Sequence, residues 1–201
     1  MKKISVIIPI YNLEKEIERC LDSVAIQDFD KRDYEICAVL DSCTDNTEGI
    51  VREWKKEHVE ICLNIFNAQC RTPGGARNVG LDMSEGEYVW FIDGDDYLTD
   101  MQAFSKLIGA MHESKRPVGY LKKFDSEKPV PENWAAWRFF YKRSFIDGIL
   151  FPDLPIDEDI KFFVNVSKRK GFCVTLIEDV LYHHTFPRKG SIVTDYYKDF
   201  L

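Results

Sequence analysis

The sequence contains no run of about 20 apolar residues, the length that a membrane-spanning helix needs. None of its six cysteines forms a Cys-X-X-Cys pair, and several lie in apolar stretches, where a free cysteine behaves as a small hydrophobic side chain. A disulfide framework is therefore not expected, and a reducing, cytoplasmic location is favoured.

The sequence also lacks an excess of positive charge. Its net charge is −7, which argues against binding of nucleic acid through a basic surface. Neither a Walker A loop nor a Gly-X-Gly-X-X-Gly motif occurs, so P-loop and dinucleotide sites lack their fingerprints. A phosphate ligand is still compatible with the acidic composition if a bound cation offsets local carboxylates.

The first half of the chain alternates between strand-like and helix-like blocks. Apolar runs predict strands at 4–10, 34–40, 59–66 and 88–92. The first run follows two lysines, as in a signal peptide, but Pro9 interrupts it and no small-residue cleavage site follows. Helical spacing appears after each of the first three runs, and Asn12 is expected to cap the first helix. Repeated β-α units predict an α/β fold, a mainly parallel sheet flanked by helices, with its ligand at the carboxyl ends of the strands.

The second half is less regular. A helix is expected over 101–111, another over 158–168 and a strand over 172–177, whereas 116–151 is aromatic, basic and rich in turn residues. The 201 residues suit a single domain. We expect residues 1–100 to form a nucleotide-binding half and residues 101–201 a smaller acceptor-side half.

Acidic residues gather where the predicted sheet binds its ligand. They follow the second strand (Asp41, Asp45), follow the fourth strand (Asp93, Asp95, Asp96) and open a later helix (Glu158, Asp159). Oxygen ligands without a Cys/His pairing favour a hard ion such as Mg²⁺ or Mn²⁺. The alternative is structural, since an Asp-Gly-Asp-Asp turn also ends strands and caps helices. Residues 73–78 also have two interpretations. They are either a turn that begins a helix, or a site where Arg77 and backbone N–H groups bind an anion.

Five short segments together resemble glycosyl transferase family 2, whose members have the GT-A fold. They are Val6–Asn12, Val39–Thr47, Gly75–Gly80, Gly86–Asp96 and Asp157–Phe163, with Ala136–Phe145 fitting a later block. The resemblance covers nearly the whole chain in order. It implies transfer of a sugar, with inversion, from a nucleoside-diphosphate sugar to a hydroxyl of a saccharide or lipid-linked saccharide in cell-surface polysaccharide or glycoconjugate synthesis.

The resemblance also implies roles for particular residues. The nucleotide sugar would be bound by Pro9, Tyr11, Asn12, Asp41, Arg77, Asp93 and Arg188. The Mn²⁺ or Mg²⁺ ion would be held by Asp93, Asp95 and His184, while His183 and His184 are as well explained as surface or packing residues. Asp159 would be the catalytic base, with Glu158 beside it, and an ordinary Asp pKa of about 3.9 would leave it ionised at neutral pH.

Two features depart from the family pattern. Leu40 stands where the family usually has the first of two aspartates, and Ser42-Cys43 replaces a more usual Gly-Ser. Both changes are expected to bear on the choice of nucleotide.

Two other functions compete with glycosyl transfer. A nucleotidyltransferase would carry a Gly-rich basic loop after the first strand, where this chain has Tyr11–Glu14. A non-catalytic nucleotide-sugar-binding protein would share the fold but would not need the catalytic base.

The basic and aromatic stretch around Trp134, Trp137, Arg138, Lys142 and Arg143 either touches a membrane or lipid-linked acceptor or forms a packed lobe. The first option would place the chain at the inner face of the membrane. The sequence does not indicate an oligomeric state.

Overall fold

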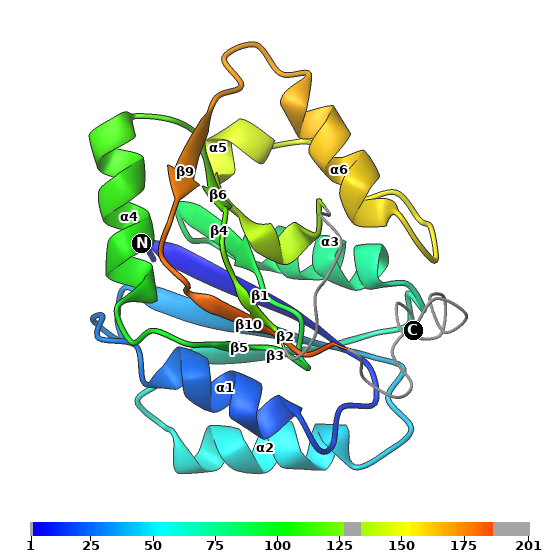
Figure 1. The fold of residues 1–201 in the computed structure, drawn as a ribbon. Coiled ribbons are helices and arrows are strands. Elements are labelled where there is room, and N and C mark those ends of the chain that lie inside the picture. Colours follow the sequence, from blue (N-terminus) through cyan, green and yellow to red (C-terminus); the bar gives the residue numbers. More distant parts are fainter. Residues whose placement is uncertain (1, 127–133, 187–201) are drawn as a thin grey trace.

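The computed structural model describes residues 2–126 and 134–186, and its centre is a seven-stranded sheet (Figure 1). Its strands, in spatial order, are β3 (Leu63–Ala68), β2 (Tyr34–Asp41), β1 (Ile4–Ile10), β4 (Tyr88–Phe91), β8 (Phe139–Lys142), β6 (Val118–Leu121) and β9 (Val174–Ile177). Only β8 runs antiparallel to its neighbours, β4 and β6. The expected mainly parallel α/β sheet is confirmed.

Helices cover both faces of this sheet. On one face lie α1 (Ile17–Ala25), α2 (Thr47–Glu57) and α4 (Ala103–Ser114); on the other lie α3 (Pro73–Met83), α5 (Arg143–Ile146) and α6 (Glu158–Ser167) (Figure 1). The core is correspondingly divided: Ile8 belongs to the cluster under α1, α2 and α4, and Ile7 to the cluster under α5 and α6. A strand that is buried on both faces needs a continuous apolar run, which explains the sequence of β1.

Close packing of α3 on β1 depends on a glycine. A Cβ at Gly80 would collide with the Ile7 side chain and touch Val39. The helix begins at Pro73, and Thr72 caps it by accepting a hydrogen bond from the Gly75 N–H (3.3 Å). The Pro73-Gly74-Gly75 segment is thus a helix start, and it orients the helix that carries Arg77.

A second, three-stranded sheet lies beside the main one. Its central strand β10 (Tyr182–His184) pairs with β5 (Tyr97–Leu98) and β7 (Asp125–Ser126). The pairing His183↔Tyr97 places the His183-His184 pair next to the Asp93–Asp96 loop. A short 3₁₀ helix, η1 (Ala136–Arg138), leads into β8.

The structure differs from the sequence expectations in three places. β6 and β8 were not expected in the stretch 116–151, and β3 begins at Leu63 because residues 59–61 form a turn. The expected cap at Asn12 is wrong, since α1 begins only at Ile17 and Glu16 occupies the cap position. In the two described ranges, no helix has the length and apolar character that crossing a bilayer requires.

Candidate active site

The loops at the carboxyl ends of β1 and β2 form one side of the candidate site. Pro9 lies on β1, and Tyr11, just beyond it, leaves 59% of its surface exposed. Asp41 ends β2 as a buried carboxylate and accepts a hydrogen bond from the Ser42 Oγ (3.2 Å). Because Ile10 and Leu40 are paired in register, Tyr11 and Asp41 follow adjacent strand positions. An exposed ring beside a carboxylate is a suitable surface for a base and its ribose.

Asn12 ties these two loops together. Its amide Nδ2 donates to the Thr44 Oγ1 (2.9 Å), and its Oδ1 accepts from the backbone N–H of Thr44 (2.8 Å) and Asp45 (3.4 Å). Asn12 (φ 50°) and Ser42 (φ 60°) both adopt left-handed backbone conformations, which cost energy in residues other than glycine. The side chain of Asn12 therefore fixes the shape of the predicted nucleotide-binding edge.

Arg77 connects the two acidic segments that the sequence places far apart. Its buried guanidinium donates from Nη1 to the Glu158 Oε1 (2.6 Å) and from Nη2 to the Asp93 Oδ1 (2.8 Å). Its Nε is also buried and has no hydrogen-bond partner among the described residues. The Asp93–Asp96 loop and the start of α6 thus meet at one guanidinium. The geometry gives Arg77 a bridging position between carboxylates, and its predicted contact with the nucleotide remains a prediction.

Asp159 is the perturbed carboxyl of this cluster. Burial raises its pKa from 3.8 to about 6, the charge of Arg77 partly opposes that shift, and the charges of Glu158 and Asp93 add to it. A carboxyl with such a pKa is still mostly ionised at neutral pH but is a stronger base than an ordinary aspartate. The loop before it is strained, since Asp157 has a φ of 65°. Perturbed carboxyls and strained loops both gather at functional sites.

Asp96 anchors the loop of the candidate site, a role that the sequence does not predict. It is fully buried and accepts three hydrogen bonds, from the Tyr182 hydroxyl (2.7 Å), the His184 Nδ1 (3.1 Å) and the Thr185 N–H (2.7 Å). These contacts fasten the end of β10 to the Asp93–Asp96 loop. The doubled aspartate of Asp-Gly-Asp-Asp was the only sequence signal for this anchor.

The backbone of Asp95 is held by a second set of contacts. The Arg19 Nη2 donates to the Asp95 carbonyl (2.9 Å) and to the Thr185 Oγ1 (3.1 Å), and that hydroxyl donates to the same carbonyl (2.8 Å). Arg19 also lies 4.5 Å from the centre of the Tyr97 ring. The loop that carries Asp93 and Asp95 is therefore fixed from α1 and from β10.

The residues around this loop are compatible with a divalent cation. Asp93 and Asp95 supply hard oxygen atoms, and Mg²⁺ is commonly held by one or two carboxylates plus substrate phosphates. A carboxylate on one ring nitrogen, as Asp96 is on His184, is the usual support of a metal-binding histidine. Burial lowers the pKa of His184, but the hydrogen bond and charge of Asp96, with Asp93 and Asp95, raise it overall. Within residues 2–126 and 134–186, no three acidic, histidine or cysteine side chains lie close enough together to hold a metal ion by themselves.

Several predicted residues lie elsewhere. Arg188 falls outside the described residues. Trp137 and Arg138 are buried, and the Arg138 guanidinium packs 4.7 Å from the Tyr120 ring centre, as expected for a packed lobe. His183 stacks on Tyr97 (4.4 Å between ring centres).

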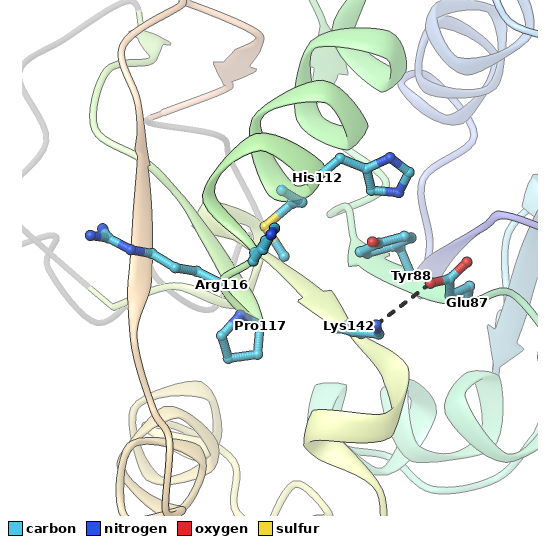
Figure 2. A pocket seen from close by; sticks show the side chains of 8 residues that line it. Glu87, Tyr88, His112, Arg116, Pro117 and Lys142 are labelled. Atoms are coloured by element: carbon cyan, nitrogen blue, oxygen red, sulfur yellow. Dashed lines mark ion pairs between the residues drawn. The ribbon is translucent and has the colours of Figure 1, made fainter.

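A pocket of about 450 Å³ lies at the opposite edge of the sheet, at the start of β4 and the end of α4 (Figure 2). Tyr88, His112 and Lys142 line it, and Lys142 faces Glu87 at 3.8 Å. Its basic side chains lie near the carboxyl end of α4, where cations complement the helix dipole. None of the residues predicted to bind the donor, hold the metal or act as the base lines this pocket, so it has no part in the chemistry argued below.

Comparisons with known proteins agree with this architecture. The family model described as glycosyl transferase family 2 matches residues 5–177. Poly(ribitol-phosphate) beta-N-acetylglucosaminyltransferase TarS of Staphylococcus aureus is 44% identical over 102 residues, covering 49% of this chain and 17% of TarS. A GalNAc(5)-diNAcBac-PP-undecaprenol beta-1,3-glucosyltransferase of Campylobacter jejuni is 28% identical over 196 residues, covering 87% of this chain and 62% of that protein. The chain thus spans less than two thirds of each of these relatives.

Solved structures share the fold. S. aureus TarS 1–349 in complex with UDP-GlcNAc superposes with a TM-score of 0.83 at 26% identity, covering 98% of this chain and 64% of that one. Mannosyltransferase PcManGT from Pyrobaculum calidifontis, in complex with GDP-Man and Mn²⁺, gives a TM-score of 0.77 at 21% identity, over 94% of this chain and 58% of that one, a likeness of fold. The expected GT-A fold is confirmed. Since the family model matches most of its length, the chain belongs to glycosyl transferase family 2.

Proposed function

We propose that this chain transfers a sugar from a nucleoside-diphosphate donor to an acceptor hydroxyl with inversion at the anomeric carbon. The observation that carries the proposal is the Arg77 bridge, which joins Asp93 to Glu158 through one guanidinium, next to Asp159, whose pKa burial raises to about 6. Residues 1–100 would bind the donor, and residues 101–201 would supply the base and the acceptor side.

The donor nucleotide would lie along the carboxyl ends of β1 and β2. Tyr11 offers an exposed ring for the base, and Asp41 offers a carboxylate for the ribose hydroxyls. Pro9 and Asn12 would shape this surface, Asn12 through its contacts with Thr44. Asp93, just beyond the end of β4, would lie nearer the ribose or the metal, and Arg188 nearer the diphosphate.

The base would act on the acceptor. As the acceptor oxygen bonds to the anomeric carbon, its proton passes to an Asp159 carboxylate oxygen and the nucleoside diphosphate leaves with the electron pair of the broken bond. Assistance of this kind is worth about 10²–10⁴-fold in rate. Arg77 would keep Glu158 and Asp93 in place, so that Asp159 is the carboxylate left to accept the proton.

Asp93, Asp95 and His184 would hold a Mn²⁺ or Mg²⁺ ion together with the donor diphosphate, because the three side chains do not form a metal-binding group by themselves in the described residues. Such an ion, when bound, stabilises the negative charge that grows on the diphosphate. Asp96 would orient His184 for this role through their 3.1 Å contact, and Arg19 would fix the backbone of Asp95.

The relatives' names indicate the class of acceptor. We extend to this chain a saccharide or lipid-linked saccharide acceptor and a part in cell-surface polysaccharide or glycoconjugate synthesis, with the reaction at the cytoplasmic face of the membrane. The six unpaired cysteines are compatible with that compartment.

The test is a matched pair of amide substitutions at the start of α6. Purified wild type, Asp159→Asn and Asp157→Asn are assayed for release of nucleoside diphosphate from a panel of nucleotide sugars with Mn²⁺, and donor binding is titrated with and without a chelator. We expect Asp159→Asn to lose about 10²–10⁴-fold in rate with donor affinity nearly unchanged. Asp157→Asn should retain activity, because Asn tolerates the left-handed conformation of residue 157.

Other outcomes would discriminate the alternatives. Near-normal turnover in Asp159→Asn would remove the base from the mechanism. Donor binding without release in the wild type would favour a non-catalytic nucleotide-sugar-binding protein. Equal donor affinity with Mn²⁺ and with chelator would count against the metal site. A nucleotidyltransferase is disfavoured by the family match and would release pyrophosphate from a nucleoside triphosphate.

A further inference from the structure

One stretch of the chain has a charge opposite to that of the whole. Residues 160–177, from α6 to β9, contain Lys161, Lys168, Arg169 and Lys170 and no Asp or Glu, although the chain carries a net charge of −7. This basic stretch begins one residue after Asp159. Figure 1 shows that α6, the turn after it and β9 lie together at the end of the molecule away from α1 and α2.

The same region leaves large apolar side chains in contact with solvent. The exposed fractions are 55% for Leu176, 49% for Trp134, 41% for Val164 and 37% for Ile160. Exposed apolar groups that gather over a charged surface indicate a binding site more often than scattered ones do.

These side chains form one surface. Leu176 is paired in register with Tyr120, whose ring lies 6.3 Å from that of Trp134, and Trp134 stacks on Phe163 of α6 at 4.8 Å. Ile160 and Val164 are four residues apart on α6 and therefore share a helix face. Lys161, exposed on α6, and Lys168 and Lys170, exposed in the turn that follows the helix, border them. We call Trp134, Ile160, Lys161, Val164, Lys168, Lys170 and Leu176 the α6–β9 surface.

We propose that the α6–β9 surface docks this protein onto a membrane containing anionic phospholipid. Trp134, Ile160, Val164 and Leu176 enter the headgroup region, and the lysines contact lipid phosphates. A Trp beside aliphatic residues with basic residues around them is the composition of an interfacial membrane contact. Each Lys or Arg near an anionic bilayer adds attraction, and long basic side chains keep their charges at headgroup level while their stems are buried.

The apolar side chains of this surface favour a lipid over other anionic partners. Basic residues alone would suit any polyanion, but four exposed apolar side chains gain nothing from a phosphate chain in water. The inference rests on the proposed function in one respect: with Asp159 next to Ile160, docking would bring the base to the level where a lipid-linked acceptor presents its sugar.

The experiment is vesicle co-sedimentation of the 201-residue chain. Vesicles of phosphatidylcholine alone are compared with vesicles of phosphatidylcholine and phosphatidylglycerol in equal parts. We expect binding to the anionic vesicles to exceed binding to the neutral ones by about tenfold or more, and to be lost near 1 M salt, where the Debye length is about 3 Å. Lys161→Gln/Lys168→Gln/Lys170→Gln should lower the anionic binding by about tenfold or more, and Val164→Ser/Leu176→Ser by about fivefold.

Matched controls change the same kinds of residue on other surfaces. Arg52→Gln/Lys55→Gln/Lys56→Gln alters α2, and Val59→Ser/Met83→Ser removes exposed apolar groups elsewhere. Both controls should bind like the wild type. All variants should release nucleoside diphosphate at the wild-type rate without vesicles, so a failure of the proposed function is measured separately from a failure of docking.

Four results would overturn the proposal. They are no wild-type binding to anionic vesicles; equal losses in the control variants; loss in the charge variant with none in the apolar variant, which would indicate a soluble polyanion such as polyphosphate; and a concentration-dependent dimer that Val164→Ser/Leu176→Ser abolishes, which would make the surface an interface between copies.

Discussion

Asp96 and Asp159 lie at the same edge of the sheet, but the two carboxyl groups differ in their burial and in their hydrogen-bond donors. Asp96 is fully buried, and three donors from residues 182–185 converge on it. Asp159 is only partly buried, yet burial raises its pKa to about 6. The Ile160 N–H (2.8 Å) and the charge of Arg77 oppose that rise, but the Arg77 guanidinium donates its hydrogen bonds to Glu158 and Asp93.

The difference separates anchoring from reactivity. A buried carboxylate whose lone pairs are satisfied by several donors holds structure together, whereas one with fewer donors has a raised pKa and is better suited to accept a proton. Arg77 connects the two regions, since it forms ion pairs with Asp93 on the Asp96 loop and with Glu158 beside Asp159. The predictions below vary these three residues.

The largest effect on stability is expected at Arg77. Arg77→Met would leave Glu158 and Asp93 close together without a counter-charge, and breaking a buried pair from one side costs about 3–5 kcal/mol. The melting temperature of Arg77→Met should therefore be lower than that of the wild type by roughly 10 °C or more. Arg52→Met, which breaks the exposed pair with Glu48, should cost less than about 1 kcal/mol. If Arg77→Met unfolds like the control, the bridge is not a structural element.

A smaller loss is expected at the anchor. Asp96→Asn replaces an oxygen that accepts hydrogen bonds with an NH₂ group that faces donors, at a cost of about 2–3 kcal/mol. Asp22→Asn is the control, since the Asp22 Oδ1 accepts a single bond from the Trp54 Nε1 (2.7 Å) and an amide oxygen replaces it well. Chemical denaturation measures both variants. An Asp96→Asn protein as stable as Asp22→Asn would contradict the anchoring role.

A substitution at Asp159 is expected to stabilise the protein instead of destabilising it. Its pKa is raised in the folded state, so its contribution to stability is present below the unfolded pKa of about 3.8 and is lost as the pH rises through about 6. Asp159→Asn should therefore be more stable than the wild type at pH 8, by about 1–2 kcal/mol, with no gain at pH 4. Melting temperatures at the two pH values test this. A loss at pH 8 would mean that the ionised carboxylate is better solvated than its burial implies.

Part of this fold could be predicted from the sequence and part could not. β1, β2 and β4 can be predicted from the sequence, because strands that are buried on both faces require unbroken apolar runs. β6 and β8 are as short as β4, but Gly119 interrupts the apolar residues of β6, and Arg138 and Lys142 bound those of β8. Their places come from pairing with each other and with β4. No local periodicity encodes such pairing.

The site divides in the same way. The acidic segments could be recognised from their motifs, and the structure brings Asp93 and Glu158 together as the sheet topology required. The role of Asp96 was not predictable, because its donors lie 86 to 89 residues further along the chain. The sequence predicts an ordinary pKa for Asp159, because it does not reveal how deeply a carboxyl is buried.

The pH dependence of kcat/KM tests the central claim most directly, because it reports the ionisation of groups in the free enzyme. If Asp159 is the base, kcat/KM for sugar transfer should rise with pH through an apparent pKa of about 6, and the residual activity of Asp159→Asn should lack that limb. A wild-type profile that stays flat from pH 8 to pH 4.5, or a limb near pH 6 that survives in Asp159→Asn, would contradict the account.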